Sequence, residues 1–372
     1  MKQNKTTMKR FTLITSLVFT SILMLLVTSV KAQDLEEEHG AQLKIYSGFV
    51  GGSYYQMAMD MQKMTRKLYG SVHYQIIDKI LPKIDPATGD TAINDNKEIR
   101  YDTIPVKIPT GDTIDFLEVH ASGGSYYNFQ KINKIDVDVT FLQYDVLLYE
   151  DIKDLGRKFK KTDDIRILLP MGSEEIHIIT LKDNKIENFG DLKKKRVGIG
   201  SSLQGTNITA KYIKEITGSK WTEVDIPYDK AFRALFSHDI DAFFFVGNAP
   251  VYDLKTLPKS MKDRLKLIGI PEDDKLKEAY GEQVEINSST YSWVVKPIKT
   301  YAVKSLLVTS LAGYPENSEE AKAKEAQITK LLQAIKQLKD KKGYHKSWTG
   351  IKFKEDPIIE WKYYKPALKL YE

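Results

Sequence analysis

The chain alternates short apolar runs with Gly- and Ser-rich turns and helical patterns, and this rhythm constrains its fold more than any other feature. A short apolar run that ends at a turn signal is typical of a buried strand. Repeated units of strand, turn and helix predict an α/β fold, in which helices cover a sheet. The units are strand 43–48, turn 51–55 and helix 56–68; strand 116–120, turn 123–127 and helix 128–132; strand 196–200, turn 201–206 and helix 207–216; and helix 228–238, strand 240–246 and turn 247–250.

The sequence Gly-Gly-Ser-Tyr-Tyr occurs twice, at 51–55 and 123–127, each time after a strand and before a helix. Glycine lets the backbone turn sharply and come close to a ligand. Ser53 and Ser125 are predicted N-caps, and the free N–H groups at a helix start attract an anion. The tyrosines supply apolar walls with a polar tip. Either these turns bind a small solute, or they are ordinary capped helices whose tyrosines pack in the core.

The third turn begins as a dinucleotide-binding loop would, with Gly198 and Gly200 after a strand and before a helix. The fingerprint for that loop requires a further glycine where this chain has Leu203, and no ribose-binding acid stands out about 20 residues later. A dinucleotide site is therefore not predicted. The polar turn 201–206 is instead suited to a small anionic or amino-acid group, which its N–H and hydroxyl donors would hold.

Residues 77–115 interrupt the rhythm with prolines, glycines and many polar residues, and predict an inserted hairpin or loop with a short strand at 101–108. The strand-like runs at 165–169, 176–181 and 290–295 are candidates for crossings between two lobes. Helical periods are predicted at 299–311 and 318–338. The tail predicts a terminal helix packed through aromatic residues and the stems of its lysines, with Trp348, Trp361, Tyr363 and Tyr364 as its aromatic residues.

The N-terminus has the layout of a signal peptide, with early positive charges, an uncharged apolar run at 11–30 and small residues at Val30 and Ala32. We expect cleavage after Ala32, near the acidic start of the mature chain. The alternative is an uncleaved membrane anchor, because the apolar run is about long enough to span a bilayer. The chain has no cysteine, which excludes disulfides, thiol chemistry and a lipoprotein anchor.

The net charge of +6 overstates how basic the mature protein is. Residues 1–32 hold five Lys or Arg and no acid, and removing those five from the 56 basic residues leaves 51 against 50 acidic residues. A nearly neutral chain has no electrostatic footprint for nucleic acid. The short basic run 193–196 is typical of a solvated face beside a strand, so no nucleic-acid partner is predicted.

Enzyme motifs are absent from the sequence: there is no nucleophile elbow, no phosphate-binding loop and no zinc-protease motif. The six histidines are far apart in sequence, so no metal site is predicted, and neither is a cofactor. His120 and His177 are interpreted as strand residues with satisfied rings. Asp241 precedes the Phe-rich strand and is interpreted as a structural residue, not as a catalytic acid.

The order of these motifs resembles the TAXI family, the solute receptors of tripartite ATP-independent periplasmic (TRAP) transporters. The resemblance covers most of residues 43–311 and rests on several motifs together. They are the Tyr-Tyr turn at 51–55; Gly124-Ser125 with Asn128; Gln143-Tyr144-Asp145; Lys195-Arg196-Val197-Gly198-Ile199-Gly200 with Gln204-Gly205-Thr206; Ile240 to Phe244 with Gly247-Asn248-Ala249-Pro250; and Tyr291.

The resemblance implies a two-lobed periplasmic-binding-protein (type II-like) fold with a hinge and a ligand cleft between the lobes. Lobe 1 would comprise residues 41–175 and 290–372, and lobe 2 residues 176–289. It further implies an extracytoplasmic receptor that captures a small carboxylate or amino acid, such as glutamate or 2-oxoglutarate, for TRAP membrane subunits. The implied ligand residues are Gly52, Ser53, Tyr54, Tyr55, Ser125, Asn128, Gln143, Ser201, Ser202, Gly205, Thr206, Val246, Gly247, Asn248 and Tyr291.

The chain also departs from the family pattern. Gln204 stands where the family has a small serine, and the insertion at 77–115 has no counterpart in the family. The family's C-terminal His-Pro-Gly-Ala is matched here only by Lys365-Pro366-Ala367. None of the four turns contains Arg or Lys, so a neutral or zwitterionic ligand stays open. Two other functions also stay open: a receptor that serves a sensor in place of a transporter, and an exported enzyme that uses the cleft.

Overall fold

The computed structural model describes residues 43–83 and 101–372. The predicted signal peptide at 1–32 and the first two residues of predicted lobe 1 lie outside these ranges. Within them, no helix has the length and apolar character needed to cross a membrane. The described residues belong to one contact unit that begins at Leu43.

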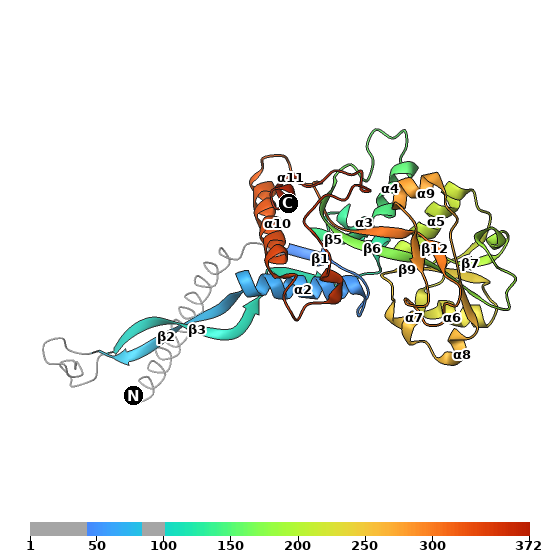
Figure 1. Cartoon of the computed structure of the whole chain (residues 1–372). Coiled ribbons are helices and arrows are strands. Elements are labelled where there is room, and N and C mark those ends of the chain that lie inside the picture. Colours follow the sequence, from blue (N-terminus) through green and yellow to red (C-terminus); the bar gives the residue numbers. More distant parts are fainter. Residues whose placement is uncertain (1–42, 84–100) are drawn as a thin grey trace, which may run out of the picture. The chain divides into compact units, whose positions relative to one another are not determined.

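A mixed sheet with helices around it forms the body of the protein (Figure 1). Its strand order is β4-β1-β5-β13-β6-β9-β7-β8, with β10 paired to β6. β1 is parallel to β4 and β5, and β7 is parallel to β8 and β9, whereas β6 and β13 are antiparallel to their neighbours. The predicted α/β class is confirmed. The strands are β1 (Leu43–Tyr46), β4 (Leu117–His120), β5 (Val139–Gln143), β6 (Ile165–Leu181), β7 (Arg196–Gly198), β8 (Thr222–Val224), β9 (Ala242–Gly247), β10 (Leu265–Ile268) and β13 (Ala302–Ser310).

Helices follow the strands as the turn pattern predicts, although several begin two or three residues earlier than predicted. The longest is α10, which confirms the helical period at 318–338: Ser318 caps it by accepting a hydrogen bond from the N–H of Ala321. The helices are α2 (Ser53–Tyr69), α3 (Ser125–Ile132), α4 (Tyr144–Lys153), α5 (Gly205–Thr217), α6 (Tyr228–Phe236), α7 (Tyr252–Thr256), α8 (Lys259–Lys262), α9 (Asp274–Tyr280), α10 (Glu319–Leu338) and α11 (Lys365–Leu368), with short 3₁₀ helices at Phe189–Leu192 and Lys346–Trp348.

The long strand β6 joins two sets of hydrophobic clusters, which give the protein its two lobes. Its first half, up to Met171, packs with side chains of α2, α3 and α10. Its second half, from Ile176, packs with side chains of α5, α6 and α9. β13 runs antiparallel beside β6 and also contributes to clusters on both sides, through Val303 and Leu307. The polar stretch 172–175 of β6 lies between the two sets.

Of three sequence predictions about this region, one is confirmed in part and two are wrong. The runs at 165–169 and 176–181 are strands, as predicted, but they form one continuous strand, in which Gly172 adopts φ +114° next to a register shift against β13. Residues 299–311 are not a helix: they form the end of β12 (Ile298–Thr300) and then β13, which is paired on both sides. Residues 290–295 are turns and not a strand, so β13 and not this segment is the second strand shared by both lobes.

Two smaller sheets complete the described fold. β12 pairs with β11 (Val284–Ile286). The predicted insertion is an antiparallel hairpin of β2 (Ser71–Pro82) and β3 (Tyr101–Ile114), so the prediction of a hairpin with a strand from 101 is confirmed, although that strand extends to Ile114. The predicted terminal helix is wrong: only the four-residue α11 forms, and Trp348 is buried in a 3₁₀ turn.

Candidate functional site

The helices α2, α3 and α5 each begin at one of the predicted binding turns. The predicted capping roles of Ser53 and Ser125 are wrong: Gly52 and Gly124 occupy the N-cap positions, and the two serines are the first helical residues. Gly124 has φ +119°, a conformation that favours glycine. The buried Ser125 hydroxyl is free for another role, and its Oγ accepts a hydrogen bond of 2.7 Å from the N–H of Gln143.

The second and third turns, which were assigned to different lobes, are in direct contact. The N–H of Tyr127 donates a 3.0 Å hydrogen bond to the carbonyl of Leu203. Gly205 is the first residue of α5 and lies very close to Gln143. A Cβ atom added at Gly205 would overlap Gln143 Oε1 and would lie 3.0 Å from the Cβ atom of Ser125. The predicted site residues Ser125, Gln143 and Gly205 therefore meet where the two lobes touch.

A carboxylate that the sequence analysis did not single out lies beside this contact. Glu174 comes from the middle of β6, and its Oε2 accepts a 2.7 Å hydrogen bond from Gln143 Nε2. The pKa of Glu174 is raised to about 7, mainly by burial, which outweighs the hydrogen bond from Gln143 that lowers it; the nearby carboxyls of Asp145 and Glu175 contribute to the rise.

Tyr54 of the first Gly-Gly-Ser-Tyr-Tyr turn reaches the same cluster. Its ring stacks on Phe141 of β5, with 4.7 Å between ring centroids. Burial, and next the negative charge of Glu174, raise the pKa of Tyr54 well above its usual value. In the second turn, Tyr126 donates a hydrogen bond to Glu150 and Tyr127 packs edge-on against Tyr46. Of these tyrosines, Tyr54 lies against Glu174, whereas those of the second turn make contacts elsewhere.

Asp145, two residues after Gln143, links α4 to the other lobe. Its Oδ2 accepts hydrogen bonds from Thr209 Oγ1 of α5, at 2.6 Å, and from the Tyr280 hydroxyl of α9, at 3.0 Å. The side chain is completely buried, and this burial raises the pKa of Asp145 to about 6. Asp145 belonged to the Gln-x-Asp motif in the sequence but was absent from the predicted ligand residues.

The side chain of Asn128, a predicted ligand residue, links two backbone segments. It is fully buried, and its Nδ2 donates to the carbonyl of Ser47 at 2.8 Å and to that of Phe141 at 3.0 Å. In the third turn, Gln204 folds back so that its Oε1 accepts from the N–H of Ser201. The departure from the family's small serine at 204 is therefore accommodated within the turn itself.

The residues of the fourth turn contact the stretch of β6 around Glu175. Val246 and Gly247 of β9 pair with Ile176 and Glu175 of β6. Asn248 Nδ2 donates to the carbonyl of Ser173 at 3.2 Å. The N–H of Ala249 donates to Glu175 Oε2 at 2.6 Å. This turn is tied to the same polar stretch of β6 as the Gln143 cluster, through the residues on either side of Glu174.

Tyr291 lies near the fourth turn, and its hydroxyl is hydrogen-bonded to other residues of the protein. Its hydroxyl accepts from the N–H of Val251 at 2.9 Å and contacts Nε2 of His177 at 2.9 Å. His177 Nδ1 lies 2.9 Å from the carbonyl of Glu175, so both ring nitrogens are satisfied, as the sequence predicted. Burial lowers the pKa of His177 to about 4, so the ring is neutral near pH 7.

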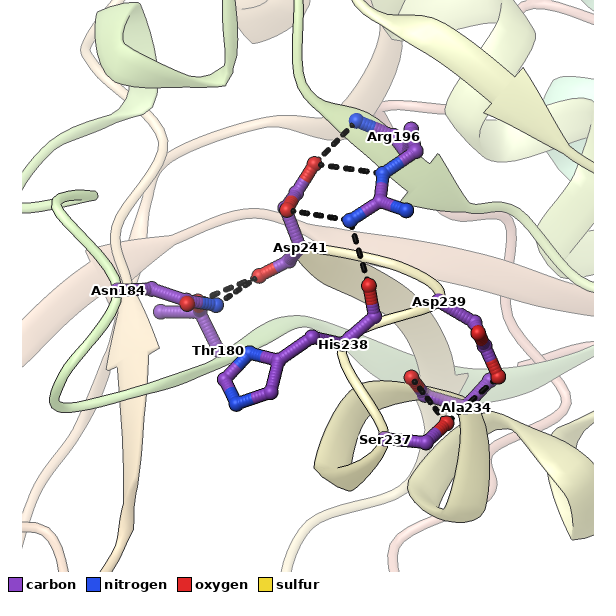
Figure 2. A network of polar contacts seen from close by, with 8 residues as sticks. All are labelled: Thr180, Asn184, Arg196, Ala234, Ser237, His238, Asp239 and Asp241. Carbon is purple, nitrogen blue, oxygen red and sulfur yellow. Dashed lines mark hydrogen bonds and ion pairs between the residues drawn. The ribbon is translucent and has the colours of Figure 1, made fainter.

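Asp241 is a structural residue, as expected (Figure 2). Its carboxylate accepts from the backbone N–H of Arg196 at 2.7 Å and from the guanidinium at 3.1 and 3.3 Å. Burial would raise the pKa of Asp241, but the hydrogen bonds from Arg196 outweigh it and lower that pKa. The carbonyl of Asp241 accepts from Thr180 and Asn184, so these contacts fix the start of β9 against β6 and β7.

The sequence thus identified part of the cluster and missed its acids. Tyr54 and Gln143 lie against Glu174, and Ser125 and Gly205 contact Gln143, whereas Asn248 and Tyr291 lie near Glu175 and His177. One signal for Glu174 was present: the polar residues 173–175 interrupt two strongly apolar runs. Two surface hollows, one around Trp361 and one around Trp293, contain none of the predicted ligand residues.

Several solved structures are similar to this chain at low sequence identity. A protein from Prochlorococcus marinus, PhnD1, solved with methylphosphonate, is 11% identical, with 80% of this chain and 84% of that chain covered and a TM-score of 0.43. A periplasmic binding protein of an arginine transport system from Legionella pneumophila is 13% identical, with coverages of 80% and 94% and a TM-score of 0.37. A putative periplasmic sulfonate-binding protein from Methylobacillus flagellatus is 10% identical, with coverages of 79% and 69% and a TM-score of 0.38.

A protein-family model gives the more direct assignment, because it is matched by the sequence itself. The model described as the NMT1-like family matches residues 104–330. This segment includes α3, β6, α5 and β9, and with them all elements of the polar cluster except α2, which carries Tyr54. The match covers more than half of the chain, which therefore belongs to the NMT1-like family.

Proposed function

We propose that this protein is an extracytoplasmic receptor that captures a small solute between its two lobes. The observation that carries the proposal is the contact between the second and third turns, where Gly205 of one lobe packs on Ser125 and Gln143 of the other. Buried polar side chains lie on both sides of this contact, among them Gln143 and Thr209, and buried polar atoms require hydrogen-bond partners. A solute bound there would touch both lobes.

The proposed mechanism is closure around the solute. A ligand that contacts both lobes stabilises their closed arrangement relative to an open one, because it gains its full set of contacts only when the lobes meet. The hydrogen bonds from Tyr127 to Leu203 and from Thr209 and Tyr280 to Asp145 would form on closure. β6 and β13, which run through both lobes, are the proposed hinge strands.

The resemblance to the TAXI family supplies the finer proposal. The solute would be a small carboxylate or amino acid of the glutamate or 2-oxoglutarate class, and the receptor would deliver it to TRAP-type membrane subunits. The proposed lobes are residues 41–175 with 290–372, and residues 176–289. The protein would be exported by residues 1–32 and act in the periplasm or another extracytoplasmic space.

The proposal is tested by calorimetry on two variants of the purified protein. Ser125→Ala removes the hydroxyl beside Gln143, and Tyr55→Ala removes a half-buried wall of the first turn. Each is expected to weaken solute binding about tenfold, as the loss of one contact worth ~1.4 kcal/mol would. Tyr252→Ala, at a tyrosine that is 75% exposed, is the control and should bind normally. Unchanged affinity in both test variants, with melting curves that show folded protein, would remove the site from this cluster.

A further inference from the structure

The polar cluster between the lobes contains two carboxyl groups without a positive partner. Asp145 is fully buried and Glu174 is partly buried, and the side chains that donate hydrogen bonds to them are the neutral groups of Gln143, Thr209 and Tyr280. Among the described residues, no Lys, Arg or His forms an ion pair with either carboxylate. Elsewhere the chain pairs its buried acids: Glu150, with a fully buried side chain, contacts both Lys153 and Lys161.

Unpartnered acceptors at the same place provide a second, independent observation. Gln143 is 4% exposed, and its Oε1 has no hydrogen-bond partner in the described part of the chain, although its Nε2 is bound to Glu174. Asp145 is 0% exposed, and its Oδ1 is likewise without a partner. A buried acceptor without a donor costs about 1–3 kcal/mol, so folded proteins rarely leave one empty without a reason.

A group that donates hydrogen bonds and carries positive charge would satisfy these acceptors and keep both acids ionised. A carboxylate group placed at the cluster would do neither, and beside Glu174 and Asp145 it would add a further negative charge at a buried position. A metal ion is a poor alternative, since the described residues hold no group of His, Asp or Glu side chains arranged to ligate one. An ammonium group has three N–H donors and one positive charge, which suits Glu174, Asp145 and the amide oxygen of Gln143.

We propose, on the basis of the receptor function above, that the solute carries a protonated amine, which Glu174 and Asp145 neutralise and Gln143 Oε1 orients. Within the class already proposed, this selects an amino acid over the corresponding 2-oxo acid. The two differ at one position, where the amino acid has an ammonium and the oxo acid a carbonyl that can only accept. The carbonyl would leave the acceptors of this cluster unpaired and its acids without a cation.

The experiment compares matched solutes by calorimetry on the full chain. The probes are glutamate against 2-oxoglutarate, alanine against pyruvate, and leucine against 4-methyl-2-oxopentanoate, together with any solute that mass spectrometry finds released from the purified protein. The wild-type protein is expected to bind at least one amine of these pairs tenfold or more tightly than its oxo partner. A released solute is expected to contain an ionisable amine.

Three variants connect this preference to the cluster. Glu174→Gln and Asp145→Asn keep the shape of each side chain and remove its charge, and each is expected to weaken amine binding at least tenfold. Glu187→Gln is the control, because this acid is 75% exposed and pairs with Lys266 at the surface, away from the cluster. It is expected to leave the preference unchanged.

The outcomes separate the two proposals. If the wild-type protein binds an oxo acid as tightly as its amine partner, or if the released solute has no amine, the amine proposal is wrong while the receptor proposal stands. Equal loss of binding in Glu187→Gln and Glu174→Gln would likewise contradict the role of Glu174. If no small solute is released and no probe binds to the wild-type protein, the receptor proposal itself is wrong.

Discussion

Single residues decide whether the two lobes can meet. Gly205 contacts Gln143 so closely that no larger residue fits without moving a buried side chain. Overpacking of this kind typically costs 1–3 kcal/mol. Sequence reasoning singled out Ser125, Gln143 and Gly205 through a resemblance between motifs. The polar break at 173–175 marked the position of Glu174, but only the folded chain shows which of these residues enters the cluster and that its neighbours come from α2 and β5.

The raised pKa values of Asp145 and Glu174 predict how the free energy of unfolding depends on pH. Burial raises the pKa of Asp145 from 3.8 to about 6 and that of Glu174 from 4.5 to about 7. At a pH between the ordinary and the raised pKa of each group, the folded protein binds more protons than the unfolded chain. These two groups therefore lower the free energy of unfolding as pH rises from about 4 to about 7. The contribution of Asp145 is at most about 3 kcal/mol, at ~1.4 kcal/mol for each unit of pKa.

The measurement is denaturant unfolding of the ligand-free protein at pH 4.5 and pH 7.5, with Asp145→Asn beside the wild type. The neighbouring titratable groups are Tyr54 on α2, Tyr212 on α5, Tyr280 on α9 and Glu175 on β6, and the lowered pKa of His177 acts in the opposite direction. The variant should gain stability relative to the wild type as pH rises. A difference between the two proteins that stays constant across this range would contradict the assignment.

At the scale of elements, the C-terminal segment is held onto α2 by one buried acid. Asp60 is 4% exposed, and its Oδ2 accepts from the N–H of His345 at 2.6 Å and from Nε1 of Trp348 at 3.1 Å. These bonds connect residues almost 290 positions apart, and Trp348 is itself buried in the core beneath α2 and α10. The tail is therefore anchored by hydrogen bonds as well as by apolar packing.

Asp60→Ala is expected to lower the free energy of unfolding by about 2–4 kcal/mol, because it leaves the buried Trp348 donor and the partly buried His345 N–H without an acceptor. Asp60→Asn retains a carbonyl oxygen that can accept from both donors, and should lose clearly less. Urea unfolding followed by tryptophan fluorescence measures both. Equal losses in the two variants would mean that the hydrogen bonds to His345 and Trp348 do not hold the segment.

Strand and helix assignments from the sequence succeeded or failed according to burial. α10 was predictable because one face is buried and the other carries Lys and Glu, which gives a clear period of 3.6. β13 was not, because nearly all of its residues are buried between β5 and β6, and a strand buried on both faces loses its alternation. The first half of β6 is buried in the same way, and its length cannot be read from two separate apolar runs.

At the scale of the whole molecule, the motif order predicted a two-lobed α/β protein, and the arrangement of β6 and β13 between two sets of cores agrees with it. The sequence could not predict the electrostatic character of the interface. The absence of Arg and Lys from the four turns left the charge of the ligand open, and the acids that define it come from β6 and α4, outside those turns.

The most direct test of the receptor function is mass spectrometry of the small molecules that the purified protein releases on denaturation, combined with thermal unfolding in the presence of amino acids and organic acids. A bound solute raises the apparent melting temperature by mass action. We predict one amine-bearing solute, released in an amount close to one per chain, which restores the melting temperature of ligand-free protein when it is added back. A protein that releases no solute, and whose melting temperature no amino acid or organic acid raises, would contradict the account.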